Sequence, residues 1–217
     1  MRTPTNRLDL ALQRLGASAR ARRKRDLRAE MRERLANQSP DDARRKSDRI
    51  TQHALETPEV AHADGVFLCL SYGTEVDTWG LVDQLLQNGQ RVYVPRADRD
   101  SHRLHVHAYP CPLETLSFGL QQPPRSEPSI ASHRLHELID VILVPGLSFT
   151  RHGDRLGQGG GYFDRFLAAA PTPALGLAFD FQLVDDLPIE PHDVPMRAVI
   201  TERGVVRART AAEVGLD

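Results

Sequence analysis

The stretch LIDVILVPG, residues 138–146, decides the fold class of this 217-residue chain. Its apolar side chains run on without the alternation of a strand that has one face in water, and a proline and a glycine end it. Such a run is typical of a strand covered on both faces, which occurs mainly in parallel sheets flanked by helices. We therefore expect residues 138–146 to form the central strand of an α/β protein.

Strand-like and helix-like segments alternate on both sides of this stretch. The other predicted strands cover residues 65–72, 91–95, 104–109, 174–179, 198–201 and 205–209. The predicted helices cover residues 21–36, 39–56, 78–88 and 162–170. This order predicts a three-layer α/β/α sandwich with a mainly parallel central sheet in a single domain. In such sheets, ligands lie beyond the carboxyl ends of the strands.

The first 20 residues differ from the rest of the chain. They carry a weak helical pattern that ends near Gly16, and we interpret them as an N-terminal arm before an α/β domain of residues 21–217. In the helix predicted for residues 21–36, apolar side chains recur every four residues and predict a stripe that packs on the core. A row of cations, Lys24, Arg28 and Arg32, recurs beside that stripe. The helix can therefore present cations along the edge of its contact with the core.

Composition limits the classes of function. The net charge is −1 at pH 7, but a basic segment, residues 1–49, precedes an acidic remainder. The two cysteines, Cys69 and Cys111, have no disulfide or metal-site spacing, which is typical of a reducing compartment. No apolar stretch approaches the roughly 20 residues of a membrane-spanning helix, and no signal peptide is recognisable. We expect a cytoplasmic protein that binds no membrane.

The glycine-rich loop RLGQGGGYFDR, residues 155–165, follows the central strand. It is not the dinucleotide fingerprint, because Tyr162 stands where the last glycine is required, and the chain has no Gly-Lys-Ser/Thr of a Walker A loop. Glycines let backbone N–H groups converge on an anion, and a helix beginning near Tyr162 adds its positive end. Arg155 adds a full charge, and Asp164 is placed for a magnesium ion carried by phosphates. On these residues alone, a phosphate site and a surface turn both stay open.

Longer segments resemble one protein family. VPGLSFTRHGDRLGQGGGYFDRFL resembles the signature of the 5-formyltetrahydrofolate cyclo-ligase family, the methenyltetrahydrofolate synthetases. The family's N-terminal helix pair is similar to KRDLRAEMRERL with SPDDARRKSDRI, and its other motifs are similar to LSYGTEVDT, VYVPR and LPIEPHDVP. The resemblance covers roughly residues 21–204, in order and at plausible spacings. Its glycine signature is highly specific, whereas the helix pair by itself is not.

The resemblance implies an activity. The family closes 5-formyltetrahydrofolate to 5,10-methenyltetrahydrofolate with ATP and magnesium, and it releases ADP and phosphate. The formyl oxygen takes the γ-phosphoryl group, N10 of the substrate attacks that carbon, and phosphate leaves. No protein nucleophile is needed, so catalysis consists largely of positioning and charge neutralisation.

The resemblance also implies the residues of the site. The residues implied for ATP are Lys24, Arg28, Arg155, Leu156, Gly157, Gln158, Gly159, Gly160, Gly161, Tyr162 and Phe163. Those implied for the folate are Leu70, Glu75, Pro95 and Arg96, with residues 158–162 also bordering it. Asp164 and Asp193 would hold magnesium, and the catalytic groups would be Glu75, Arg155 and Tyr162. Glu75 could orient the pterin or accept a proton at N10, and the sequence does not separate these roles.

Simpler interpretations accompany these residues. Lys24 and Arg28 also fit a solvated charge run, and Glu75 and Asp193 also fit a helix cap and a turn cap. The rival function is a nucleic-acid-binding module that uses the basic N-terminal helices. A third possibility is a relative of the same fold without cyclo-ligase activity. We favour an enzyme with small-molecule substrates that binds no nucleic acid and is a monomer.

Three residues depart from the family's pattern. Phe163 replaces a second tyrosine, Gln122 stands where an acid often precedes proline, and Arg197 stands where an acid is frequent. None of the three removes a group implied to bind phosphate or magnesium. Together they leave room for an altered substrate preference.

Overall fold

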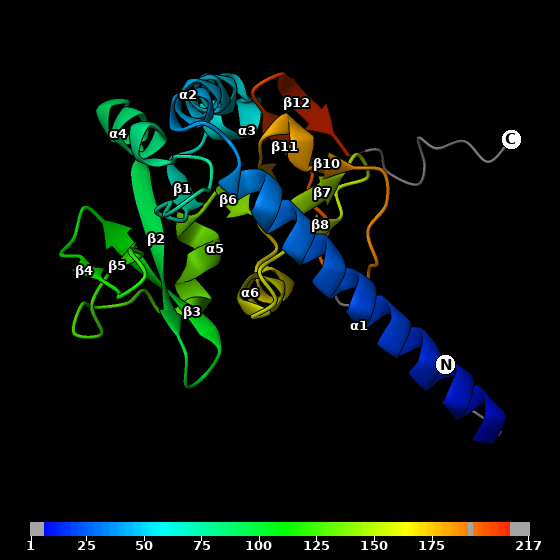
Figure 1. Cartoon of the computed structure of the whole chain (residues 1–217). Coiled ribbons are helices and arrows are strands. Elements are labelled where there is room, and N and C mark those ends of the chain that lie inside the picture. The colour runs from blue at the N-terminus through cyan, green and yellow to red at the C-terminus, as the bar shows by residue number, and fades with distance from the viewer. Residues whose placement is uncertain (1–6, 191–192, 209–217) are drawn as a thin grey trace, which may run out of the picture.

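A computed structural model describes residues 7–190 and 193–208, and its central sheet has seven strands (Figure 1). The strands of this sheet are β1 (Gly65–Leu68), β2 (Arg91–Asp98), β3 (Arg103–Tyr109), β6 (Val141–Pro145), β9 (Ala174–Leu177), β11 (Ala198–Thr201) and β12 (Gly204–Arg207). Their order is β12-β11-β9-β6-β1-β2-β3. The pairs from β11 to β2 are all parallel, and the edge strands β12 and β3 are antiparallel to their neighbours. The mainly parallel sheet is thus confirmed, with β6 at its centre.

Helices cover both faces of the sheet. They are α1 (Arg7–Ala36), α2 (Pro40–Glu56), α3 (Pro58–Ala61), α4 (Trp79–Gln87), α5 (Leu135–Leu138) and α6 (Tyr162–Ala169), with single 3₁₀ turns at Ser132–Arg134 and Asp180–Gln182. A small sheet joins β10 (Leu183–Val184), β7 (Ser148–Thr150) and β8 (Arg155–Leu156), and a hairpin joins β4 (Glu114–Thr115) and β5 (Gln121–Gln122). The hairpin and the small sheet lie on opposite sides of the main sheet's carboxyl edge (Figure 1).

The strand pleat divides the core into two clusters. In β1, Val66 and Leu68 pack with Leu85 of α4 and with residues of α1 and α2. Phe67 points to the other face, where its ring stacks on Phe166 of α6 with the ring centroids 4.8 Å apart. Because successive side chains of a strand point to opposite faces, an unbroken apolar strand requires helices on both sides. This arrangement confirms the three-layer α/β/α sandwich.

Helix α1 runs unbroken through Gly16, so the predicted end of a helix near Gly16 is wrong. A glycine inside a helix costs only about 1 kcal/mol relative to alanine, and its neighbours here are mostly good helix formers. The C-terminal half of α1 packs on the core through Met31 and Leu35, as the stripe predicts, and the N-terminal half projects from the fold (Figure 1). Residues 1–6 of the predicted arm, and residues 209–217 at the other end, lie outside the described residues. The division between arm and domain stays a prediction.

Substitution of Gly65 by alanine is expected to lower the free energy of unfolding by about 3 kcal/mol. A β-carbon at this first residue of β1 would overlap the backbone carbonyl oxygen of Leu138 and would lie 3.1 Å from the ring of Tyr93. A backbone carbonyl cannot move aside as a flexible side chain can. Urea unfolding measures the effect, and Gly80→Ala in α4 is the control, because no atom lies within 4 Å of its added β-carbon. Equal stability of the two variants would contradict the prediction.

Candidate active site

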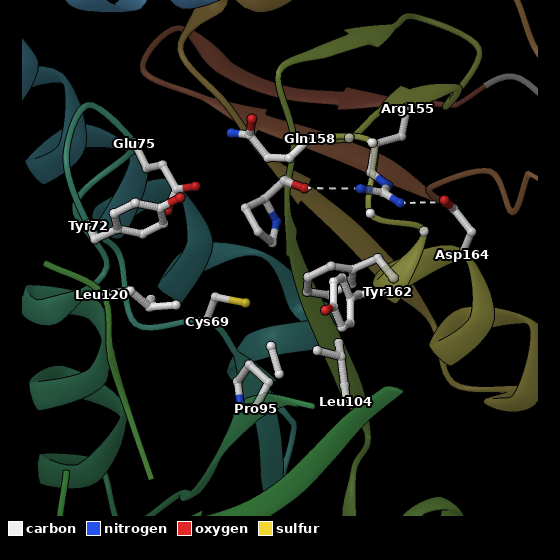
Figure 2. A pocket seen from close by; sticks show the side chains of 18 of the residues that line it. Cys69, Tyr72, Glu75, Pro95, Leu104, Leu120, Arg155, Gln158, Tyr162 and Asp164 are labelled. Carbon is white, nitrogen blue, oxygen red and sulfur yellow. Dashed lines mark hydrogen bonds and ion pairs between the residues drawn. The ribbon is translucent and has the colours of Figure 1, made fainter. Parts of the chain in front are cut away.

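A cavity of about 760 Å³ lies at the carboxyl ends of the parallel strands (Figure 2). Its walls come from the residues that follow β1 and β6, from one side of β2, from the glycine loop, from α1 and from the β4–β5 hairpin. This is the edge where ligands of open α/β sheets bind. Segments that are far apart in the sequence therefore meet in one place.

The cavity is lined by all but one of the residues implied for the site. These residues are Lys24, Arg28, Leu70, Glu75, Pro95, Arg155, Leu156, Gly157, Gln158, Gly159, Gly160, Gly161, Tyr162, Phe163, Asp164 and Asp193. Arg96 does not line it. In β2 the alternate residues Pro95 and Ala97 border the cavity, and successive side chains of a strand point to opposite faces. The structure brings the other residues together, and their binding roles stay predictions.

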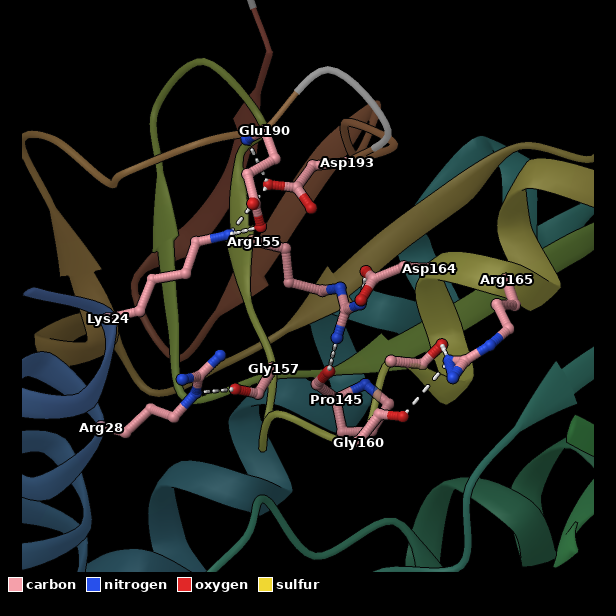
Figure 3. A network of polar contacts seen from close by, with 11 residues as sticks. Lys24, Arg28, Pro145, Arg155, Gly157, Gly160, Asp164, Arg165, Glu190 and Asp193 are labelled. Carbon is pink, nitrogen blue, oxygen red and sulfur yellow. Dashed lines mark hydrogen bonds and ion pairs between the residues drawn. The ribbon is translucent and has the colours of Figure 1, made fainter. Parts of the chain in front are cut away.

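One half of the cavity is cationic (Figure 3). Lys24 of α1 donates to the Glu190 carboxylate over 2.7 Å and lies 3.5 Å from a carboxylate oxygen of Asp193. One turn further along α1, Arg28 donates from Nε to the carbonyl oxygen of Gly157 over 2.9 Å. Burial lowers the pKa of Arg28, as does its neighbour Arg32. The cationic row of α1 therefore faces the glycine loop.

Arg155 is the most enclosed cation of this half, with a side chain only 5% exposed. Its Nη2 donates to Oδ1 of Asp164 over 2.6 Å, and its Nη1 donates to the carbonyl oxygen of Pro145 over 3.4 Å. The guanidinium lies 5.4 Å from the ring centroid of Phe163, which is the usual range of a cation–π contact. Burial lowers the pKa of Arg155, and the charge of Asp164 counteracts that effect. A fixed positive charge is thereby held inside the cavity.

The glycine loop takes a backbone course that side chains would oppose. Gly159 and Gly161 have φ values of 102° and 66°, in the left-handed region that favours glycine. Gly161 is the N-cap of α6. Within the described part of the chain, the N–H groups of residues 157–161 donate no hydrogen bond, whereas carbonyl oxygens of this loop accept from Arg28, Arg32 and Arg165. A loop whose carbonyls are engaged and whose amides are open suits an anion.

The other half of the cavity is mostly apolar (Figure 2). Cys69, Leu70, Pro95, Leu104, Leu116, Leu120 and Phe163 line it. Glu75 and Tyr72 lie on one side, and Tyr162 lies across from them (Figure 2). Burial raises the pKa of Glu75 to about 7. Glu75 also borders a second cavity of about 330 Å³, so it lies in the wall between the two spaces.

The three departures from the family pattern have different surroundings. Phe163 keeps an aromatic ring beside Arg155. Gln122 is buried, where its Oε1 accepts from the backbone N–H of Ala97 and its Nε2 donates to Glu114, so it connects β5 to β2 and β4. Arg197 is exposed and does not line the cavity. Gln122 also lines the cavity, so a neutral amide stands there in place of the acid that the family often has.

Several residues that line the cavity were not identified as site residues from the sequence. They include Cys69, Tyr72, Arg99, Phe118 and Glu190. Only Glu190 carried a usable signal, because an acidic residue three positions before Asp193 can share a turn with it. The backbone N–H of Glu190 indeed donates to Oδ2 of Asp193 over 2.7 Å. His192, which lies between them in the sequence, is outside the described residues.

The fold and the cavity together define a class: an α/β protein with a cavity at the carboxyl edge of a parallel sheet, where a glycine loop with open amides adjoins an apolar pocket. The chain belongs to the 5-formyltetrahydrofolate cyclo-ligase family, whose model matches residues 20–202. It is therefore an enzyme of a ligase family. None of the helices within the described residues is long and apolar enough to span a membrane.

Individual relatives carry the same name. The chain is 39% identical over 145 residues to a 5-formyltetrahydrofolate cyclo-ligase of Mycolicibacterium smegmatis, covering 63% of this chain and 73% of the relative. It is 32% identical over 186 residues to the one of Escherichia coli K12, covering 79% and 96%. Among solved structures, Aquifex aeolicus 5,10-methenyltetrahydrofolate synthetase is similar with a TM-score of 0.73 at 28% identity, covering 87% and 94%.

Proposed function

We propose that this enzyme converts 5-formyltetrahydrofolate to 5,10-methenyltetrahydrofolate with ATP and magnesium, and that it releases ADP and phosphate. The observation that carries the proposal is a single cavity that joins a cationic glycine-loop half to an apolar half with a half-buried carboxyl, Glu75. In the proposal the nucleotide triphosphate occupies the first half, and the pterin and p-aminobenzoyl groups of the reduced folate occupy the second. The reaction needs both ligands side by side.

In this proposal the triphosphate lies against residues 155–163. The open N–H groups of residues 157–161 face its oxygens, and Arg155 and Arg28 supply charge. Lys24 would exchange its carboxylate partners, Glu190 and Asp193, for a phosphate oxygen. A positive charge already held in a buried position needs little reorganisation as charge develops on the transferred group.

The residues fit a magnesium ion carried by the nucleotide. Asp164 and Asp193 both line the cavity on the side of Arg155 (Figure 3). Magnesium in phosphoryl-transfer sites is typically held by one or two carboxylates and the substrate's phosphates. The described residues contain no group of three or more His, Cys, Asp or Glu that could hold a metal ion by themselves. Magnesium would neutralise charge on the phosphates.

The folate would occupy the apolar half. Leu70, Glu75 and Pro95 line this part of the cavity, and Tyr162 faces both halves from the end of the glycine loop. The formyl oxygen would attack the γ-phosphorus and displace ADP. N10 would then attack the formyl carbon, lose its proton and expel phosphate. Glu75 would orient the pterin by hydrogen bonds or accept that proton, and Arg155 would stabilise the charge on the phosphoryl group.

The geometry favours the enzyme over the rival nucleic-acid interpretation at three cations. Lys24, Arg28 and Arg155 point into the cavity, where each already contacts a carboxylate or a carbonyl oxygen (Figure 3). Other arginines of α1, including Arg22 and Arg25, are exposed and keep a basic face on this helix. Nucleic-acid binding would need such a face for phosphates of a long polymer. A cytoplasmic location and a monomeric state remain parts of the proposal.

The proposal predicts methenyl product when the protein is mixed with ATP, magnesium and 5-formyltetrahydrofolate. The rise of the product's near-ultraviolet absorbance measures the reaction, and ADP release measured in parallel should match it one to one. Reactions without ATP and with heat-denatured protein are the controls. No product above these controls would refute the proposal, and strongly salt-dependent binding to mixed-sequence DNA or RNA would favour the rival.

A further inference from the structure

The apolar half of the cavity opens to solvent along β2. Pro95 and Ala97 are alternate residues of β2, and Arg99 is the first residue after this strand. All three line the cavity. The first two are half-buried, and Arg99 is exposed. Since a strand advances about 6.7 Å for every two residues, the wall runs roughly 13 Å from Pro95 to Arg99. Arg99, the exposed residue of the three, therefore marks the mouth of the cavity at the outer end of this wall.

An aromatic ring holds Arg99 at this mouth. The guanidinium of Arg99 lies 5.8 Å from the ring centroid of Phe118, in the turn between β4 and β5. Phe118 is 47% exposed, which is unusual for so large an apolar side chain. Its ring packs edge-to-face with the ring of Tyr72, with the two centroids 5.5 Å apart. A guanidinium that rests on a ring keeps its donors available and loses less conformational freedom when it binds a ligand.

The charge of Arg99 is not neutralised from within the protein. In the part of the chain that the structure describes, no carboxylate forms an ion pair with Arg99. The carboxylate of Asp98 accepts from Ser101 and from the backbone N–H of Asp100, and Asp100 itself lies 3.8 Å from Arg125. Lys24 and Arg155, at the inner end of the cavity, do have carboxylate partners. Arg99 is thus a cation at a cavity mouth that is open to an external anion.

We propose that Arg99 binds a carboxylate of the glutamate portion of the reduced folate and thereby selects folates with a charged tail. This inference rests on the proposed function. With the formyl group near Glu75 and the glycine loop, the p-aminobenzoyl group extends along the wall of Pro95 and Ala97, and the glutamate reaches the mouth. The glutamate carboxylates are the only anionic groups of this substrate, and a guanidinium pairs with a carboxylate through two parallel hydrogen bonds.

Calorimetric titration tests the proposal, with magnesium and a non-hydrolysable ATP analogue present. The two probes are 5-formyltetrahydrofolate and its dimethyl ester, in which both glutamate carboxylates are blocked. The native enzyme is expected to bind the acid about tenfold more tightly than the ester. Arg99→Gln is expected to bind the acid about tenfold more weakly and the ester as the native enzyme does. Arg99→Lys should retain part of the preference, because it keeps the charge but loses the planar pair of donors.

The matched control is Arg103→Gln, because Arg103 is an exposed arginine of the same β2–β3 hairpin that does not line the cavity. It should keep the native preference for the acid. The proposal is overturned if Arg99→Gln leaves the preference intact, if it weakens both probes equally, or if Arg103→Gln has the same effect. Binding of the ATP analogue without any binding of 5-formyltetrahydrofolate would refute the proposed function, and this inference with it. If the native enzyme cyclises 5-formyltetrahydrofolate and Arg99→Gln still prefers the acid to the ester, this inference alone is refuted.

Discussion

Substitution of Arg155 by alanine is expected to lower kcat/KM for the cyclisation by about a thousandfold or more. An arginine that stabilises charge on a transferring phosphoryl group contributes on this scale. Lys24 and Arg28 approach from α1, on the other side of the loop (Figure 3). Because Arg155 lies in the cationic half, KM for ATP should rise far more than KM for the folate. Steady-state kinetics with each substrate varied in turn measure both effects.

The same substitution also has a structural cost. It would remove the ion pair of 2.6 Å and leave the carboxylate of Asp164 partly buried without its guanidinium. Removing one partner of an enclosed ion pair typically destabilises a protein by about 3 kcal/mol. Circular dichroism and urea unfolding must therefore accompany the kinetics. Arg155→Lys, which keeps a charge, should fold like the native enzyme but still lose most of its activity.

Arg151→Ala is the matched control for this prediction. Arg151 is an exposed arginine in the turn between β7 and β8, four residues before Arg155, and it does not line the cavity. Its loss should leave kcat/KM within about twofold of the native value. A well-folded Arg155→Ala variant that keeps its KM for ATP and loses affinity only for the folate would show that the two halves of the cavity are misassigned.

The periodicity of the sequence was sufficient to identify the layers but not the order of the strands. Residues 141–145 are apolar at every position because helices cover both faces of β6, and that signal is local. The neighbours of β6 are β1 and β9, and the neighbours of β1 are β6 and β2. Such pairing depends on contacts between distant segments, which no single segment encodes. Short strands such as β4 and β8 have two residues each, too few for any period to be visible.

The sequence predicted the site residues that belong to a motif with many characteristic positions, and it did not predict cavity residues that stand outside any motif. The glycine loop concentrates its signal in eleven residues, whereas Phe118 and Arg99 meet only because two hairpins pack together. Arg96 shows a second limit. It follows Pro95 in a motif, but neighbouring residues of a strand lie on opposite faces, and Arg96 does not line the cavity. Gly16 shows a third limit, because a helix former on each side can outweigh one glycine.

Substitution of Glu75 by glutamine is expected to lower activity and to raise stability above pH 7. Burial raises the pKa of Glu75 from 4.5 to about 7, so the folded protein holds this proton more tightly than the unfolded chain does. The contribution of Glu75 to the free energy of unfolding is therefore most favourable below pH 4.5, and it becomes less favourable as the pH rises from 4.5 to 7. Above pH 7 the charge on Glu75 lowers the free energy of unfolding by about 3 kcal/mol, and a neutral glutamine of the same shape removes this loss.

Thermal unfolding at two pH values measures this effect. At pH 5 the native enzyme and Glu75→Gln should unfold at similar temperatures, and at pH 8 the variant should unfold several degrees higher. The ionisable neighbours do not obscure the result, because burial also raises the pKa values of Cys69 and Tyr72 and keeps both neutral at pH 8. Glu33→Gln, at an exposed position on α1, is the control. The difference in unfolding temperature between this variant and the native enzyme should be the same at pH 5 and at pH 8.

The activity of Glu75→Gln should change in the opposite direction. If the carboxylate form orients the pterin or accepts the proton from N10, kcat/KM of the native enzyme rises with pH up to a plateau above about pH 7. The variant should lack this rise, and its kcat/KM at pH 8 should be about a hundredfold lower. A gain in stability with a loss of turnover is the pattern of a group that folding disfavours and catalysis requires. A variant that is more stable at pH 8 and keeps native kcat/KM would show that Glu75 is a buried acid without a role in the reaction, and a variant that is less stable at pH 8 would show that its carboxylate is held by favourable contacts.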